Sequence, residues 1–325
     1  MNITILGGGG FLGQKLARAL AKRERLRDRF IGKLTLADLM EPPSIDAPFE
    51  VETIALDVTD RDATREACKD QDVSYHLAAI VSGQAEAEFD LGVDVNLMGS
   101  LNVFEGARDD GGCPVVVFTS SVVVYGGEVP DPIEDWTALN PQTSYGTQKA
   151  AAELLLNDYS RKGFLDGRGV RLPTITIRPG RPNAAASGFM SSIFREPLQG
   201  EPSNCPVAED YPIWHSAPRT VIRNLVHAAE VQAADLGQNR CFALPGRTDT
   251  VREMIDAMTR VAGPEPEARI TWSADPAVTA VVGSWRAHLN PAKALALGFE
   301  ADASFEDSVR WFLEDDIATP AQTPD

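Results

Sequence analysis

The chain has 325 residues, of which 43% are hydrophobic, and its formal net charge is −17. That length has room for one large α/β domain or two smaller ones. The acidic balance argues against a nucleic-acid or anionic-membrane partner, because no basic patch dominates. No apolar stretch reaches the ~18 residues without charges that a membrane span needs. Met1 leads directly into an apolar run and the four cysteines are scattered, so we expect no signal peptide, reduced thiols and a cytoplasmic protein.

The first predicted elements are a strand, a glycine turn and a helix. Residues 1–6 form an apolar run typical of a buried parallel strand, and residues 14–29 show helical periodicity. The glycine-rich stretch between them fits a dinucleotide-binding motif in two registers. Glycines let the backbone approach a pyrophosphate closely, and the helix N-terminus offers free N–H groups to that anion. The registers are Gly8-x-Gly10-x-x-Gly13 and Gly7-x-x-Gly10-x-x-Gly13.

Acidic residues end the next two predicted strands. Asp38 closes the strand Lys33–Asp38, about 25 residues after Gly13 and near the ~20 expected of a carboxylate that binds ribose hydroxyls. A carboxylate there repels a 2′-phosphate, and no arginine follows directly, which favours NAD over NADP. Asp57 follows the strand Glu50–Leu56, where an acid can reach the adenine amino group. For Asp38 the alternative is an aspartate that only ends a strand.

Strands and helices alternate through the first 180 residues. This alternation predicts an α/β fold, a Rossmann-type doubly wound parallel sheet whose ligands bind at the carboxyl ends of the strands. The further strands are predicted at 73–79, 114–119 and 172–178, and the helices at 60–69, 93–109 and 143–162.

The composition of the sequence changes at about residue 180. Residues 180–218 are rich in Pro, Ser, Gly and Asn with little periodicity, as in a segment that covers a substrate or makes a surface excursion. A helix is predicted at 220–234, a strand at 240–244 and a helix at 250–261, capped by Thr248 or Asp249. We therefore expect an NAD-binding domain of residues 1–180 plus about 217–245. A smaller substrate-binding lobe would consist of about 181–216 and 246–325.

Two polar residues sit among the predicted cofactor contacts. His76 ends a strand before small residues that let backbone lie against a cofactor, and a histidine there is more often structural than catalytic. Asn96 lies inside a predicted helix, where its amide competes for backbone hydrogen bonds. This suggests that Asn96 orders a neighbouring strand or water, although an exposed asparagine is an equal alternative.

Tyr145 and Lys149 lie four residues apart in a predicted helix, so their side chains share one face. A phenol titrates near pH ~10 and is a poor base at neutral pH, but a nearby ammonium favours the phenolate and lowers that pKa. With a hydroxyl from Ser120 or Ser121 to share the substrate oxygen, the group can move a proton on or off an alcohol. This chemistry suits an oxidoreductase with a hydride acceptor beside it.

Together these motifs resemble the extended short-chain dehydrogenase/reductase family, which includes nucleotide-sugar epimerases and dehydratases. The resemblance covers about residues 1–245 and includes the Ser-Ser pair before Val124-Tyr125-Gly126. It implies that Ser121 is the catalytic serine, Tyr145 the base and Lys149 a helper that also bonds the nicotinamide ribose. It implies NAD as cofactor, no metal, and a homodimer formed through the helices at 93–109 and 143–162. The predicted cofactor-binding residues are Gly7, Gly10, Phe11, Leu12, Gly13, Asp38, Asp57, Val58, Leu77, Ala78, Ala79, Asn96, Tyr145, Lys149 and Pro179.

The chain departs from the sugar-nucleotide enzymes after Arg178. The usual Asn-x-Tyr-Gly-Pro pattern is missing, and Arg181 replaces a residue that commonly faces the substrate. Arg219 adds a guanidinium where the substrate lobe closes. Arginine suits a carboxylate because its fork makes two parallel bonds, so we expect a small acidic substrate. The alternatives are a diphosphate or surface ion pairs. The predicted substrate-binding residues are Ser120, Ser121, Tyr145, Arg181, Asn183 and Arg219.

The run from Arg178 to Gly200 resembles a branch of this family that oxidises the C2 hydroxyl of D-erythronate, a four-carbon sugar acid, to the 2-keto acid. The resemblance implies the same NAD-dependent reaction here. The alternative is a nucleoside-diphosphate-sugar 4-epimerase or dehydratase with the same Ser, Tyr and Lys. A redox-sensing binding protein is a third possibility, which the retention of both Tyr145 and Lys149 disfavours.

Overall fold

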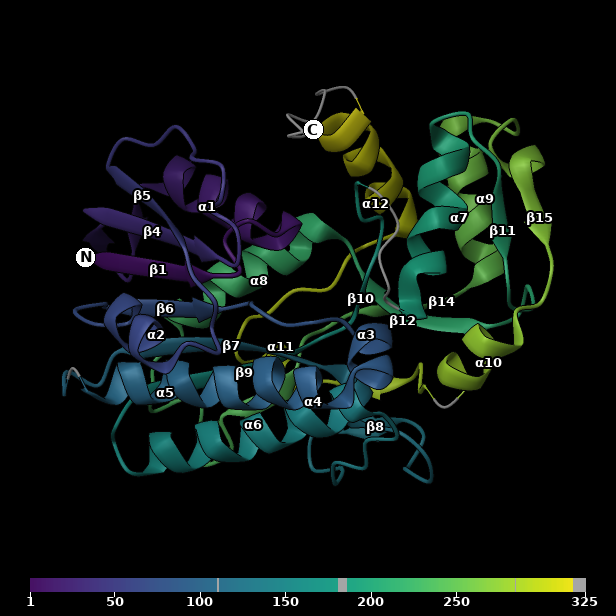
Figure 1. Ribbon diagram of the computed structural model, residues 1–325. Helices are drawn as coiled ribbons and strands as arrows, with labels where there is room; N and C mark the ends of the chain where they lie inside the picture. Colours follow the sequence, from purple (N-terminus) through teal and green to yellow (C-terminus); the bar gives the residue numbers. More distant parts are fainter. Residues whose placement is uncertain (110, 181–185, 284, 318–325) are drawn as a thin grey trace.

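The computed structural model describes residues 1–109, 111–180, 186–283 and 285–317. Its centre is a seven-stranded parallel sheet in the order β13-β9-β7-β6-β1-β4-β5 (Figure 1). The chain reverses direction across the sheet between β1 and β6, and such a switch point opens a crevice at the carboxyl ends of the strands. The Rossmann-type prediction is confirmed. The strands are β1 (Asn2–Leu6), β4 (Lys33–Asp38), β5 (Glu50–Ala55), β6 (Val73–His76), β7 (Val115–Ser121), β9 (Asp166–Leu172) and β13 (Cys241–Ala243).

Helices cover both faces of this sheet (Figure 1). On one face, α1 (Phe11–Arg23) and α8 (Pro218–Glu230) pack their apolar stripes against Ile3, Ile5 and Tyr75. The stripe predicted in α1, which includes Leu16 and Leu20, is buried. The other face carries α2 (Arg61–Ala67), α5 (Gly99–Asp109) and α6 (Ser144–Arg161), which share a second apolar cluster with the sheet. The three layers hold the strand ends and helix starts in place around the crevice.

Two sequence predictions of element boundaries are wrong. The first helix ends at Arg23 rather than residue 29, because Glu24 turns into the left-handed region with φ 60° and a short hairpin follows, β2 (Arg25–Leu26) with β3 (Arg29–Phe30). The strand predicted at 172–178 is also misplaced, since the sheet strand is β9. The sequence of β9 contains two glycines and two arginines, so it lacks the apolar pattern of a buried strand. Gly169 packs closely on β13, where a Cβ would lie 2.4 Å from Cys241 Sγ.

A second apolar core lies beside the carboxyl ends of the strands, at the right of Figure 1. It is built by α7 (Phe189–Leu198), α9 (Val251–Ala262) and α12 (Phe305–Phe312) around Phe194, Met254 and Phe305. The sequence did not predict α7. Helix α9 begins with a capping box between Thr250 and Glu253, not with Thr248 or Asp249.

Smaller elements connect the sheet and the second core. The division of the chain into two domains stays a prediction, and Ala294 and Phe299, which it assigns to the lobe, pack with the sheet. Among the described helices, none has both the length and the apolar character needed to cross a bilayer. The connecting elements are α3 (Ser82–Ala87), α4 (Phe89–Gly92), β8 (Ile133–Glu134), β10 (Thr174–Ile175), β11 (Ser203–Cys205), β12 (Pro212–Ser216), β14 (Arg247–Thr250), β15 (Ile270–Trp272), α10 (Pro276–Val282), β16 (Leu289–Asn290) and α11 (Ala292–Ala296).

Candidate active site

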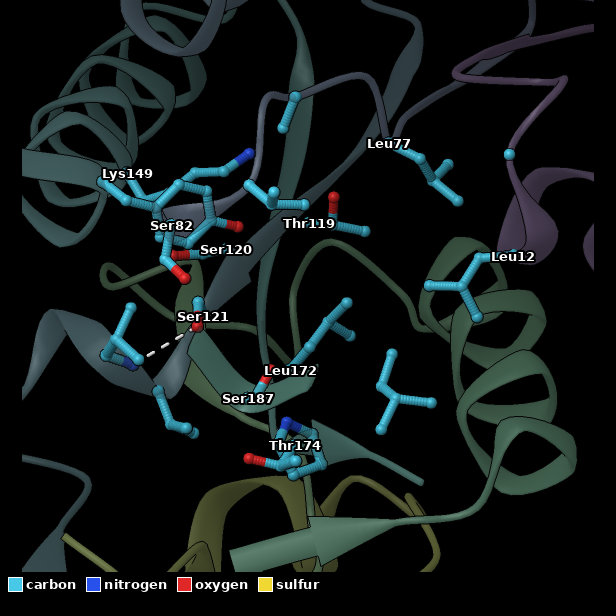
Figure 2. Close-up of a pocket in the computed structure, with 18 of the residues that line it drawn as sticks. Leu12, Leu77, Ser82, Thr119, Ser120, Ser121, Lys149, Leu172, Thr174 and Ser187 are labelled. Atoms are coloured by element: carbon cyan, nitrogen blue, oxygen red, sulfur yellow. Dashed lines mark hydrogen bonds between the residues drawn. The ribbon is translucent and has the colours of Figure 1, made fainter. Parts of the chain in front are cut away.

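A cavity of about 370 Å³ lies at the carboxyl ends of the central strands (Figure 2). The glycine loop after β1, the segment after β6, the end of β7 and the start of α6 all contribute to its wall. Its other wall comes from residues 172–175, Arg178, Ser187 and Trp285. The cavity therefore joins segments that are far apart in the sequence. The predicted site residues that line it are Gly7, Gly10, Phe11, Leu12, Gly13, Leu77, Ala79, Ser120, Ser121, Tyr145 and Lys149.

The glycine loop forms a cradle that larger residues would fill. Gly7 has φ 90°, and a Cβ on Gly13 would lie 2.2 Å from the Gly7 carbonyl oxygen. Gly7, Gly10 and Gly13 line the cavity, whereas Gly8 packs against Leu36, which favours the register Gly7-x-x-Gly10-x-x-Gly13. Helix α1 starts after Gly10 with no side-chain cap, so its first N–H groups are available to an anion.

Asp38 lies beside this loop, where a ribose-binding acid is expected. Its Oδ2 accepts a hydrogen bond of 2.9 Å from the Gly9 N–H, and Oδ1 accepts one from Leu39 N. Asp57 instead accepts bonds from the backbone and hydroxyl of Thr59. Six predicted cofactor residues are absent from the cavity wall, so their cofactor contacts stay predictions: Asp38, Asp57, Val58, Ala78, Asn96 and Pro179.

Asn96 orders a neighbouring segment, which is the first of the two alternatives that the sequence left open. It is buried in a π-helical turn, Val93–Met98, a local irregularity that is frequent at functional sites. Its Oδ1 accepts from Ile80 N at 3.0 Å, and its Nδ2 donates to Ile80 O and to Gln148 Oε1. The side chain thereby ties the cavity-lining loop after β6 to α6.

His76 has a structural environment. Its Nε2 lies 2.9 Å from Ser100 Oγ, the residue is fully buried, and burial lowers the pKa of His76 to about 3. The imidazole is therefore neutral at physiological pH. His76 does not line the cavity, which agrees with the prediction that it has a structural rather than a catalytic role.

The hydrogen bonds of the two serines distinguish their roles. Ser120 is buried and donates its hydroxyl proton to Glu153 Oε1 at 2.5 Å, so that proton is not available to a substrate. Ser121 Oγ accepts the N–H of Val123 at 3.3 Å, which leaves its own proton to donate elsewhere (Figure 2). Ser121 is thus the better donor to a substrate oxygen.

Glu153 belongs to a buried polar network that the sequence did not reveal. It lies one turn beyond Lys149 on α6, and its carboxylate accepts three hydrogen bonds of 2.6–3.1 Å from the Arg171 guanidinium. Arg171 also donates to the Tyr125 hydroxyl. The Glu153 charge acts on Lys149 in the direction that raises the pKa of the lysine.

Lys149 is a buried amine whose Nζ has no hydrogen-bond partner in the described part of the chain. The Nζ lies 4.7 Å from the centroid of the Phe118 ring and 5.8 Å from that of Tyr145. Burial lowers the pKa of Lys149 to about 7 and raises the pKa of Tyr145 to about 12. Burial alone accounts for the raised pKa of Tyr145. The opposing effect of a charged Lys149 on the pKa of Tyr145 therefore stays a prediction.

The arginines differ most from the sequence predictions. Arg219 does not reach the cavity, because its guanidinium pairs with Glu314 and Asp315 and stacks over Trp311. Its predicted contact with the substrate is therefore not supported by this geometry. The predicted residues Arg181 and Asn183 lie outside the described residues. Arg178, which was not predicted as a site residue, lines the cavity instead.

The site fits a nicotinamide dinucleotide. The glycine cradle and the uncapped start of α1 suit a pyrophosphate, and the orphaned Lys149 Nζ needs acceptors such as ribose hydroxyls. Ser121 and Tyr145 line the same cavity. Fold and site together define an NAD-dependent oxidoreductase of the Rossmann type.

Comparison with known proteins identifies the family. Residues 3–235 match the NAD dependent epimerase/dehydratase family, and the chain belongs to it. The D-erythronate dehydrogenase of Cupriavidus necator is 49% identical over 97% of this chain and 98% of that protein. The D-erythronate dehydrogenase of Haemophilus influenzae is 41% identical over 98% of this chain and 100% of that protein.

Solved structures share the fold. A nucleoside-diphosphate-sugar epimerase from Agrobacterium tumefaciens superimposes with a TM-score of 0.93 at 42% identity, covering 98% of this chain and 95% of that one. A GalE-like L-threonine dehydrogenase from Cupriavidus necator superimposes with a TM-score of 0.82 at 24% identity, covering 97% of this chain and 99% of that one. The chain is an NAD-dependent dehydrogenase of this family.

Proposed function

We propose that the protein oxidises the C2 hydroxyl of D-erythronate to 2-keto-D-erythronate. The observation that carries this proposal is that Ser121, Tyr145 and Lys149 meet the glycine loop in one cavity. The two D-erythronate dehydrogenases that match nearly the full chain support the choice of substrate. A cavity of about 370 Å³ is ample for a four-carbon acid beside the reactive end of a cofactor.

Tyr145 is the proposed base. As a phenolate it takes the proton of the C2 hydroxyl, while the free hydroxyl proton of Ser121 bonds the oxygen that becomes a carbonyl. NAD, when bound, supplies the acceptor for the C2 hydride. Lys149 would hold the nicotinamide ribose, and an acceptor at its Nζ favours the ammonium form. A charged Lys149 then opposes the burial that raises the pKa of Tyr145 in the cofactor-free protein.

The test is formation of NADH, followed by its absorbance, when the purified protein is incubated with NAD and D-erythronate. We expect turnover with the acid and none with nucleotide sugars, and Tyr145→Phe serves as the inactive control. Absence of NADH with D-erythronate under conditions where NAD binds would refute the proposed reaction.

The epimerase alternative has one observation in its favour, the name of the Agrobacterium tumefaciens structure that superimposes at a TM-score of 0.93. A nucleotide-sugar epimerase shows no net NADH output. Conversion of a nucleoside-diphosphate sugar into its 4-epimer, measured by chromatography with no absorbance change, would establish this alternative.

We also propose that the protein is a homodimer. Apolar side chains are exposed on the helices predicted to pair, with Met98 at 44% and Leu154 at 67% exposure, and Phe89 nearby at 60%. Burial of such side chains between two copies would remove them from water. Light scattering should give twice the mass of the chain, and Leu154→Glu should give a monomer. A monomeric parent protein would contradict this.

A further inference from the structure

The cavity that holds Tyr145 has basic side chains in its lining, although the protein as a whole is strongly acidic. Among the described residues, the cavity wall includes the basic side chains of Lys149 and Arg178 and no aspartate or glutamate. The chain as a whole carries 47 acidic and 30 basic residues. A cluster of this sign against that background favours a negatively charged ligand.

Arg178 is held in place by hydroxyl and carbonyl groups rather than by an acid. Its Nη2 donates to Ser187 O at 3.1 Å and to Ser187 Oγ at 3.3 Å, and its Nε donates to Ser191 Oγ at 3.4 Å. The backbone N–H of Arg178 bonds the same Ser191 hydroxyl. The guanidinium is thereby oriented without being neutralised.

No carboxylate of the described residues lies within ion-pair distance of Arg178. Two buried arginines in this part of the molecule are paired, by contrast: Arg171 with Glu153 and Arg195 with Glu196. Burial and the charge of Arg195 lower the pKa of Arg178 to about 10, which still leaves the guanidinium charged at neutral pH. A partly buried, oriented and unpaired cation is a ready anion site.

The two cations lie on different sides of the cavity. Figure 2 shows Lys149 on one side of Ser121, and Ser187 and Thr174 on the other. Ser187 accepts hydrogen bonds from Arg178, so the guanidinium belongs to the second side. Lys149 shares its helix with Tyr145 and is the residue predicted to bind the ribose, so Arg178 is the basic side chain that remains for the substrate.

We propose that Arg178 binds the carboxylate of the substrate and restricts the enzyme to 2-hydroxy acids. This rests on the proposed function, in that the substrate is a sugar acid. The carboxylate carbon is bonded directly to C2, so a guanidinium that grips the carboxylate also places the C2 hydroxyl, rather than a more distant one, before Ser121 and Tyr145. The fork geometry of arginine allows two parallel bonds to the carboxylate.

Binding is measured separately from turnover. The NADH-loaded protein cannot transfer hydride from an alcohol, so calorimetry can compare D-erythronate with its amide, in which a neutral group replaces the carboxylate at C1. We expect the parent protein to bind the acid at least ~30-fold more tightly than the amide, the loss usual for an unpaired buried charge contact. We expect Arg178→Met to lose that preference, and Arg178→Lys to retain part of it.

Arg195→Met is the matched control. Arg195 is buried next to Arg178 and donates to its carbonyl oxygen, but it does not line the cavity. We expect this variant to keep the preference for the acid. NADH affinity and the unfolding midpoint show whether each variant is folded.

Each outcome decides a different point. Equal binding of acid and amide by the parent protein, or an unchanged preference in folded Arg178→Met, overturns the role of Arg178. If Arg178→Met does not fold, the comparison of acid and amide in the parent protein and the Arg178→Lys variant still test the role of Arg178. A folded Arg178→Lys variant with undiminished affinity for the acid would contradict recognition of the carboxylate by two parallel bonds from the guanidinium. Selective binding of the acid without NADH formation in the NAD-loaded parent would refute only the proposed reaction.

Discussion

Replacement of Lys149 by methionine is expected to stabilise the cofactor-free protein while it abolishes turnover. The lysine Nζ is buried over the Phe118 ring with no hydrogen-bond acceptor among the described residues. A buried ammonium without a partner costs free energy, whereas methionine fills a similar volume without a charge. Lys149 therefore lowers the free energy of unfolding unless its Nζ has a hydrogen-bond acceptor.

The magnitude follows from the pKa of Lys149, which falls from 10.5 to about 7 on folding. Each unit is worth ~1.4 kcal/mol, so the charged lysine destabilises the folded protein by at most ~5 kcal/mol. Below about pH 7 both states are protonated and this cost is present in full. Between about pH 7 and 10.5 the unfolded chain keeps a proton that the folded protein has released. The free energy of unfolding of the parent protein therefore rises with pH across that window, and the advantage of Lys149→Met shrinks.

The assay is urea-induced unfolding of the NAD-free parent and variant at about pH 6 and about pH 9. Lys69→Met is the control, because the Lys69 side chain is 57% exposed and its loss should change the free energy by no more than ~0.5 kcal/mol. The reasoning is refuted if Lys149→Met is less stable than the parent at the lower pH, or if the difference between them does not narrow at the higher pH.

Three further changes test other parts of the site. Tyr145→Phe should lower turnover by ~10²–10⁴ with NAD affinity intact, as stopped-flow and calorimetry would show. Gly10→Ala should fold normally, since its Cβ would meet only Gly7 O at 3.4 Å, yet weaken NAD binding, whereas Gly13→Ala should lower the unfolding midpoint as well. Glu153→Gln should cost ~3–5 kcal/mol in denaturant unfolding by leaving Arg171 unpaired, and apolar replacement of both should recover most of it.

The parts of the site whose position the sequence could predict are local in the chain. The glycine loop needs only the strand before it and the helix after it, and Tyr145 and Lys149 meet through the pitch of one helix. Asp38 ends the neighbouring strand, whose register on β1 puts it beside the loop. In the glycine loop and in the Tyr145–Lys149 pair, spacing within one short segment decides the geometry, and Asp38 needs only the pairing of two strands that follow each other in the chain.

The parts that the sequence missed depend on pairing between distant segments. β9 is a sheet strand because β7 and β13 pair on either side of it, although its own residues are glycines and arginines. Arg219 was predicted to bind substrate, but acids some 95 residues later in the chain neutralise it. Whether an arginine is free or paired is a property of the packed structure, and residue type alone does not show it.

The same argument explains why Ser120 and Ser121 can be told apart only in the structure. As neighbours in one strand they point to opposite faces of the sheet, and pairing decides what each face meets. The face of Ser120 meets Glu153 and Arg171, which hold its proton in a buried network, whereas Ser121, which also lines the cavity, keeps its proton unused. A Ser121→Ala variant should therefore lose turnover with little change in stability, and Ser120→Ala should do the reverse by leaving part of the Glu153 carboxylate unsatisfied. Equal loss of turnover in both variants, with equal unfolding midpoints, would contradict this division of roles.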